Sequence, residues 1–158
     1  MRDEHGRALD LLAGHLGAER PRAGWGDEHD RAALYHRSFD APGARGLLLA
    51  AALEEPVPSI RSWIGVQMIE RVPPGELEHW LRVADDPYAE RRALEVARLR
   101  DLASAPFDAS EIEGWSDWLQ RRAVVETHRP DVLEALALHG RSKKVRATAK
   151  EFLEVLTS

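Results

Sequence analysis

The chain has no cysteine among its 158 residues. This absence excludes disulfide bonds, thiolate metal ligands and cysteine nucleophiles. Long apolar runs are missing too, because the longest, from Leu47 to Leu53, has seven residues and is far too short to cross a bilayer. The N-terminal residues contain no apolar run either, so we expect no signal peptide. These absences predict a soluble, cytoplasmic protein without a membrane partner.

Strand signals are also scarce. No segment alternates apolar and polar residues with a period of two, and no Asn-Gly or Asp-Gly turn is present. Apolar residues instead recur at helical spacing, most clearly in the series Val145, Ala149, Phe152 and Leu156. With 44% hydrophobic and 31% charged residues, the composition is that of a globular chain. We therefore predict an all-α fold of about nine helices.

Prolines, glycines and capping residues set the expected helix boundaries. Asp27 is a good N-cap for the second helix, and Gly140 is a good stop for the eighth. The seventh expected helix contains Gly114, which is a candidate break in it, and its expected buried residues include Val125. The expected helices cover residues 7–17, 28–39, 44–54, 59–72, 76–84, 87–102, 108–127, 132–139 and 145–156.

A basic residue recurs near the start of the longer helices. Arg61, Arg92, Arg122 and Arg146 follow one another at spacings of 31, 30 and 24 residues. All of them except Arg122 come after a short expected helix and a turn. Two helices per unit of about 30 residues are typical of an α-solenoid.

The turn Asp85-Asp86-Pro87, followed by Arg91-Arg92-Ala93-Leu94, resembles the HEAT-like (armadillo-type) helical repeats, and looser copies extend the resemblance over about residues 44–156. The resemblance implies a single all-α domain over residues 1–158. This domain would be a short right-handed α-α superhelix in which residues 1–40 form an N-terminal helical cap. The resemblance also implies a structural role for the recurring arginines, which would each bond an acidic residue in the adjacent turn. These structural arginines are Arg61, Arg92 and Arg146.

The charge of the chain is unevenly distributed. The net charge is −5 and the pI about 5.8, which disfavours nonspecific binding to nucleic acid. Residues 141–150, however, contain five basic side chains and no acidic one. In solenoids the inner helices line the concave binding face, so we expect a mixed-charge strip on the longer helices to bind a partner. The candidate residues of this strip are Arg91, Arg98, Arg121 and Lys143.

Trp25 stands between two glycines in the loop Ala23-Gly24-Trp25-Gly26. Exposed aromatic side chains are frequent anchors at protein interfaces, so Trp25 is a further candidate partner-binding residue. The alternative is that its indole folds back and closes the N-terminal cap.

No catalytic, metal or nucleotide motif is present. None of the serines stands in a G-x-S-x-G context, and no glycine-rich phosphate loop occurs. His29 and His36 lie seven residues apart, whereas two histidines that bind one metal on a helix are typically four residues apart. We therefore expect no resident metal or cofactor. A metal-dependent helical-bundle enzyme built around these two histidines is the second alternative.

The leading hypothesis is a non-enzymatic protein–protein interaction module, either an adaptor or an immunity (antitoxin) protein. Small, acidic, all-α chains suit the antitoxin role because an acidic surface can cover a basic nuclease. The first alternative is a nucleic-acid-binding HEAT-like module related to the DNA alkylation repair proteins, although no catalytic carboxylate of that family can be matched here. The abundance of Ala, Arg, Leu and Gly, with few Lys, is typical of a high-GC bacterial genome.

Overall fold

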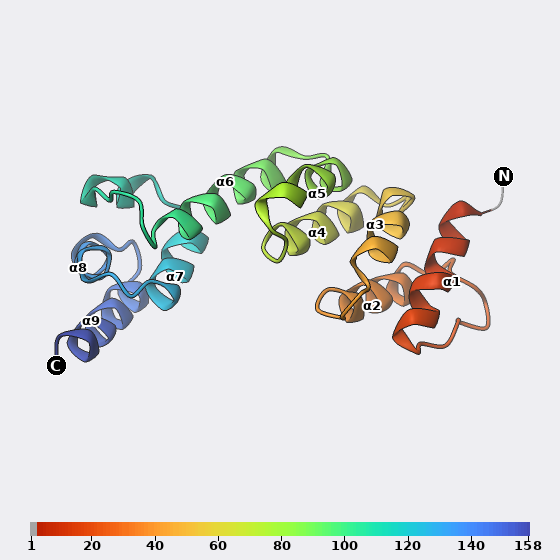
Figure 1. Ribbon diagram of the computed structural model, residues 1–158, viewed down its shortest axis with the longest axis horizontal. Helices are drawn as coiled ribbons and strands as arrows, with labels where there is room; N and C mark the ends of the chain where they lie inside the picture. Colours follow the sequence, from red (N-terminus) through yellow and green to blue (C-terminus); the bar gives the residue numbers. More distant parts are fainter. Residues whose placement is uncertain (1–2) are drawn as a thin grey trace. The chain divides into compact units, whose positions relative to one another are not determined.

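The computed structural model describes residues 3–158. Over this range the chain forms nine α-helices and two short 3-10 helices, with no strand (Figure 1). The predicted all-α class is therefore confirmed. None of the helices in the described range is both long enough and apolar enough to cross a membrane.

The chain divides into two compact units, Met1–Ala93 and Leu94–Ser158. The boundary between them falls within helix α6 (Pro87–Asp101), which begins in one unit and ends in the other. The single domain over residues 1–158, with a cap over 1–40 and helix pairs over 44–156, stays a prediction.

In the first unit, α1 packs against α3 and α4 packs against α5. The buried residues of these helices form its core, and the largest include Leu9, Leu12, Leu48, Ile64 and Trp80. Asp27 accepts a hydrogen bond from the backbone N–H of His29, which confirms the predicted N-cap. The elements of this unit before α6 are α1 (Glu4–Leu16), α2 (Glu28–Ser38), α3 (Arg45–Leu53), α4 (Pro58–Ile69), η1 (Pro74–Glu76) and α5 (Leu77–Ala84).

Among the described residues of this unit, three charged residues are buried, and two of them, Arg31 and Glu55, lie close together. Arg31 of α2 is 4% exposed, and Glu55, just after α3, is 1% exposed. The hydroxyl of Tyr35 donates to Glu55 Oε2 at 2.8 Å, and His5 Nε2 lies 3.0 Å from the same hydroxyl. The four polar groups form a buried network that ties α1, α2 and the end of α3 together.

In the second unit, α8 packs against α9 and η2 packs against α8. Trp115, Leu102, Ile112, Leu133 and Leu136 are among the large side chains of its core. The elements after α6 are η2 (Ala109–Gly114), α7 (Asp117–Glu126), α8 (Pro130–His139) and α9 (Lys143–Thr157).

The single helix expected over residues 108–127 is two helices in the structure. Trp115 is extended, with φ −78° and ψ 137°, and Ser116 caps α7 by accepting from the N–H of Leu119. The extended residue resets the helical phase, so the expectation that Val125 is buried was wrong. Val125 is 61% exposed, and its neighbour Val124 is buried instead.

Candidate functional site

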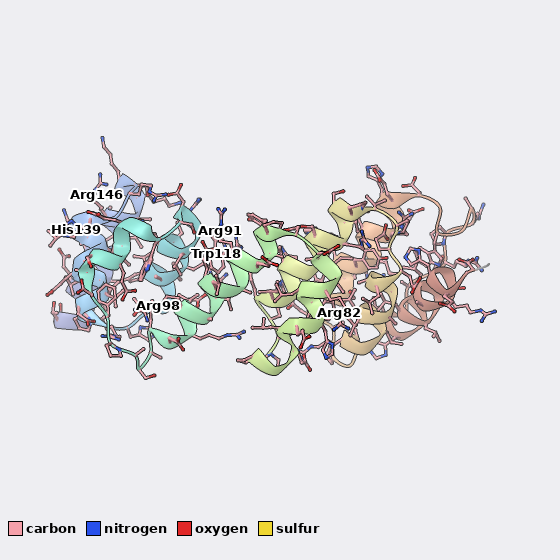
Figure 2. The ribbon with its side chains drawn as sticks, turned by 90° about the horizontal axis from the view of Figure 1, so that it is seen from above. Arg82, Arg91, Arg98, Trp118, His139 and Arg146 are labelled. Carbon is pink, nitrogen blue, oxygen red and sulfur yellow. The ribbon has the colours of Figure 1, made fainter. Side chains whose placement is uncertain are left out.

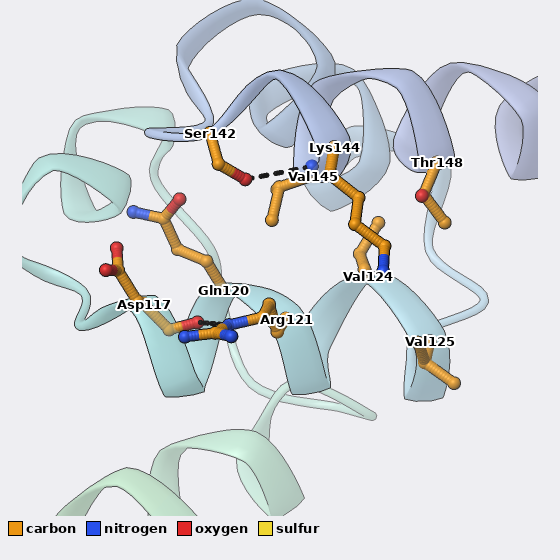
Figure 3. A pocket seen from close by; sticks show the side chains of 9 residues that line it. All are labelled: Asp117, Gln120, Arg121, Val124, Val125, Ser142, Lys144, Val145 and Thr148. Carbon is orange, nitrogen blue, oxygen red and sulfur yellow. Dashed lines mark hydrogen bonds between the residues drawn. The ribbon is translucent and has the colours of Figure 1, made fainter.

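A groove runs between α7 and α9 in the second unit (Figure 3). Its volume is about 550 Å³, within the range of roughly 300–1,000 Å³ that is typical of binding pockets. The residues that line it are Asp117, Gln120, Arg121, Val124, Val125, Ser142, Lys144, Val145 and Thr148.

The floor of the groove is apolar. Val124 and Val145 are each 3% exposed and close the groove from below, while Val125 stands open to solvent beside them. Exposed apolar surface next to a concavity is typical of an interaction site. Val125, rather than the two buried valines, therefore offers apolar surface that a partner could bury.

Helical spacing explains why these residues line one groove. Asp117, Arg121 and Val125 follow one another at four-residue steps along α7, and Lys144 and Thr148 do so along α9. Residues four apart lie on one helical face. Each helix thus presents one continuous row of side chains to the groove.

Gln120 holds the closed end of the groove in place. Its buried amide nitrogen donates to the carbonyl oxygens of Ile112 (3.2 Å) and Trp115 (3.3 Å), and its amide oxygen accepts from the N–H of Arg141 (2.8 Å). This one side chain ties η2, α7 and the turn before α9 together. Ser142 adds the N-cap of α9 by accepting from the N–H of Val145 at 3.1 Å.

Two positive charges on the groove have no carboxylate partner. Arg121 donates from Nε to the carbonyl oxygen of Asp117 at 3.2 Å, and Lys144 forms no ion pair among the described residues. Figure 3 shows the Lys144 side chain reaching from α9 toward α7. Asp117, the one acidic lining residue, is already paired with Arg141 at 3.3 Å. The groove is therefore apolar at its floor and positive at its rim.

The predicted strip residues have different environments. Arg121 lines the groove, and Lys143 is exposed at the first position of α9, next to Lys144. Arg91 is exposed on α6 and has no ion-pair partner in the described part of the chain (Figure 2). Arg98, by contrast, is held by Glu111 through two hydrogen bonds of 2.9 and 2.8 Å and by the carbonyl of Pro106. Its guanidinium is thus occupied within the second unit.

Trp25 is half-buried in the first unit. Its indole Nε1 donates to Asp10 at 2.8 Å, and its carbonyl oxygen accepts from Arg31 at 2.9 Å. The indole therefore packs back toward α1, as in the alternative interpretation of this residue.

The three recurring arginines bond to different groups. Arg92 forms an ion pair with Glu70, the residue that follows α4, at 2.8 Å. Arg146, labelled on α9 in Figure 2, donates instead to the carbonyl oxygens of Gly140 and Arg141. Arg61 has a buried Nε without a hydrogen-bond partner in the described structure. Among the described residues, Arg92 is thus the one of the three with an acidic partner, and that partner follows α4 and does not lie in the turn before α6.

No three His, Asp or Glu side chains within residues 3–158 come together as a metal site would require. His29 lies 3.3 Å from Asp27 at the start of α2, and both side chains are largely exposed. His36 makes an edge contact with the ring of Phe39, 6.0 Å between centroids. The two histidines are therefore not brought together with a third ligand.

Sequence patterns did not reveal the groove, although Arg121, Lys143 and Lys144 belonged to the predicted basic regions. The residues that were missed are Gln120, Val124, Ser142 and Thr148. The one signal available was the Ser116 N-cap, which would have set the phase of α7. No family model, curated protein or solved structure is significantly similar to this chain.

Proposed function

We propose that the chain is a non-enzymatic interaction module that binds a partner protein in the α7–α9 groove. The observation that carries the proposal is the exposed apolar Val125 beside two cations, Arg121 and Lys144, that no carboxylate neutralises. Full burial of a valine side chain contributes about 1.5–3 kcal/mol. The flanking cations would add specificity for an acidic partner and speed its association.

The proposal includes the helical-repeat architecture expected from the sequence. α8 and α9 form a packed pair, and Arg92 bonds an acidic residue near the end of α4, which support a HEAT-like arrangement. An adaptor or an immunity protein in the cytoplasm is the form of this function that suits a small acidic chain best. The groove would then recognise the partner directly.

Nucleic acid is the second candidate ligand, because Arg121, Lys143 and Lys144 could contact phosphates. The net charge of −5 opposes this binding. A nucleic-acid ligand would also leave the exposed Val125 without a role, whereas a protein partner would contact both the apolar floor and the basic rim.

The test compares affinity capture from native lysate by the wild-type chain and by four variants. Val125→Asp and the double variant Arg121→Glu/Lys144→Glu alter the groove. Leu138→Asp and Lys150→Glu are their matched controls, because Leu138 is similarly exposed on α8 and Lys150 is an exposed lysine of α9 outside the groove lining. Far-UV circular dichroism confirms that each variant is folded.

We expect one stoichiometric protein to be retained by the wild type and by both controls and lost from both groove variants. If the groove variants still retain the partner protein, the partner binds another surface of the chain. A nuclease-sensitive ligand that elutes with salt would favour the nucleic-acid alternative. Failure of the wild-type chain to retain any macromolecule would overturn the proposal.

A further inference from the structure

We infer that the occupant of the α7–α9 groove is a single amphipathic helix that runs antiparallel to α7 and α9, with apolar residues in its N-terminal half and acidic residues in its last turn. This inference rests on the proposed function and adds the chemistry and direction of the partner. It follows from the direction of the two groove helices and from the uneven distribution of charge along them.

α7 and α9 run in the same direction. The turn before α9 meets the beginning of α7, where Arg141 contacts Gln120 and Asp117. Farther along, Val124 and Val125 line the groove together with Thr148 (Figure 3). Both helices therefore begin at one end of the groove and run toward the other.

The end at which both helices begin is positive. Arg121, Lys143 and Lys144 lie there, and the only acidic lining residue is paired with Arg141. Each helix N-terminus adds a partial positive charge, about half an elementary charge per helix. Two parallel helices place these partial charges at the same end, so they reinforce the side-chain charges.

At the other end, none of the described residues that line the groove is basic, although Lys150 follows on another face of α9. Beyond Thr148, Phe152 and Val155 continue the row along α9 at helical spacing and are 39% and 73% exposed. The acidic residues Glu151 and Glu154 stand beside them. The C-terminal ends of α7 and α9 contribute partial negative charge at this end.

A helix fits this surface better than an extended strand. The backbone groups of α7 and α9 are already bonded within each helix, so a strand would find no edge with which to pair. A helix laid along the groove would pack its apolar face on Val125 within the groove and on Phe152 beyond it, as in other helix-in-groove complexes. An antiparallel direction places its own negative C-terminal end against the positive end of the groove.

The inferred partner pattern is unusual and therefore diagnostic. Apolar residues at i, i+3, i+4 and i+7 occupy the first half, and Asp or Glu occupies the last turn. Acidic residues at a helix C-terminus are unfavourable in the isolated helix, because they lie next to the negative end of its dipole. Acidic residues in the last turn of a helix therefore become favourable only when that helix binds a positive surface such as this one.

The first experiment selects binders from a displayed library of an 18-residue helix with randomised outward-facing positions. Clones that bind the wild-type chain are kept only if they fail to bind Val125→Asp. We expect Asp and Glu to be at least about tenfold more frequent in the last turn than in the first. Equal frequencies, or an excess in the first turn, would overturn the inferred direction.

The second experiment determines the direction of the bound helix from cross-linking rates and does not depend on its affinity. Because the chain has no cysteine, Lys143→Cys and Val155→Cys each introduce a unique thiol, and the two sites are about 18 Å apart along α9. Selected peptides carrying a cysteine in the last turn should form a disulfide with Lys143→Cys at least tenfold faster than with Val155→Cys. Peptides with a cysteine in the first turn should show the opposite preference.

Reversed preferences would overturn the antiparallel direction while leaving the groove as the binding site. A library that yields no groove-dependent helix would overturn the inference of a helical partner. The lysate capture with the groove variants would still decide the proposed function by itself. The two failures are therefore distinguishable.

Discussion

Arg31 and Glu55 form a buried two-point ion pair, with Nε 2.9 Å from Oε2 and Nη2 3.0 Å from Oε1. The remaining guanidinium nitrogen, Nη1, donates to the carbonyl oxygens of Trp25 and Gly26. Glu55 also accepts from the N–H of Val57 at 3.1 Å. Because these polar atoms are bonded to protein groups, the pair is tolerated in the interior of the first unit.

Removal of one member of this pair should strongly destabilise the first unit. Arg31→Met leaves the Glu55 carboxylate buried without its cation, and such a change costs about 3–5 kcal/mol of the free energy of unfolding. Arg45→Met is the matched control, because Arg45 pairs with Glu76 at the same 2.9 Å but in solvent. We expect the control to cost about 0–1 kcal/mol. Urea denaturation of both variants measures the difference, and equal losses would contradict the assigned role of burial.

The stability of the first unit should fall at mildly acidic pH. Burial lowers the pKa of His5 below its ordinary value of 6.5; the nearby Glu55 opposes this shift, and Arg31 adds to it. The unfolded chain therefore binds a proton at His5 at a higher pH than the folded chain does. As pH falls below 6.5, protons favour the unfolded state until the folded pKa is also passed.

The substitution His5→Gln should remove this part of the pH dependence, because the Gln amide can still donate to Tyr35. The measurement is the urea midpoint of both proteins from pH 7.5 to 5. We expect the wild-type midpoint to fall relative to the variant below pH 6.5. Parallel curves would contradict the lowered pKa of His5.

A second loss should follow at lower pH through Glu55. Burial would raise its pKa, but hydrogen bonds from Arg31, Tyr35 and the N–H of Val57 outweigh burial, so the pKa is lowered below its usual range. The carboxylate therefore stabilises the fold above the ordinary Glu pKa of 4.5. This stability is lost as pH falls from there through the folded pKa. Acid unfolding of Glu55→Gln, which lacks this titration, should be less steep than that of the wild type.

Gly65 marks the closest approach of α4 to α5. A Cβ atom at this position would lie 2.5 Å from Ala84 Cβ and 2.8 Å from the carbonyl oxygen of Trp80. Gly65→Ala should therefore force the two helices apart and cost about 1–3 kcal/mol. Gly14→Ala in α1, where the added methyl meets nothing within 4 Å, should stabilise the chain by about 0.5–1 kcal/mol. Opposite shifts of the melting temperature are the expected result, and a tolerated Gly65→Ala would contradict the close packing.

Charge reversal should separate two arginines that the sequence pattern grouped together. Arg98→Glu breaks the two hydrogen bonds to Glu111 and places like charges together, so we expect a loss of about 1.5–3 kcal/mol. Arg121→Glu loses only one bond to a backbone carbonyl and should change stability by less than about 0.5 kcal/mol. Thermal unfolding measures both effects. A loss of binding by Arg121→Glu would therefore report on the binding surface, whereas a loss of binding by Arg98→Glu could also result from reduced stability.

The positions of the helices were predictable because their signals are local. Asp27 caps α2, and prolines stand at the first position of α4, α6 and α8. Such signals act within a few residues and are visible in the sequence itself. The break before α7 was also locally encoded, in Ser116, but the long apolar period across it concealed the change of phase.

The groove and the buried ion pair were not predictable in the same way. Arg31 and Glu55 are 24 residues apart, and Gln120 reaches the N–H of Arg141, 21 residues away. Each pair depends on how separate helices pack. The residues next to each member in the sequence do not indicate that packing. The exposure of Val125 differs from these two cases, because it follows from the extended Trp115 before α7, which is a local feature.

The bonds of Gln120 have a kinetic consequence. Because one buried amide already joins three segments around the groove, we expect little backbone rearrangement when the proposed partner binds. Association should then be limited by encounter and by the ordering of the partner, and differences in affinity among partners should lie mainly in how long each stays bound. The residence time of the complex thus depends on the quality of the contacts over the valine floor.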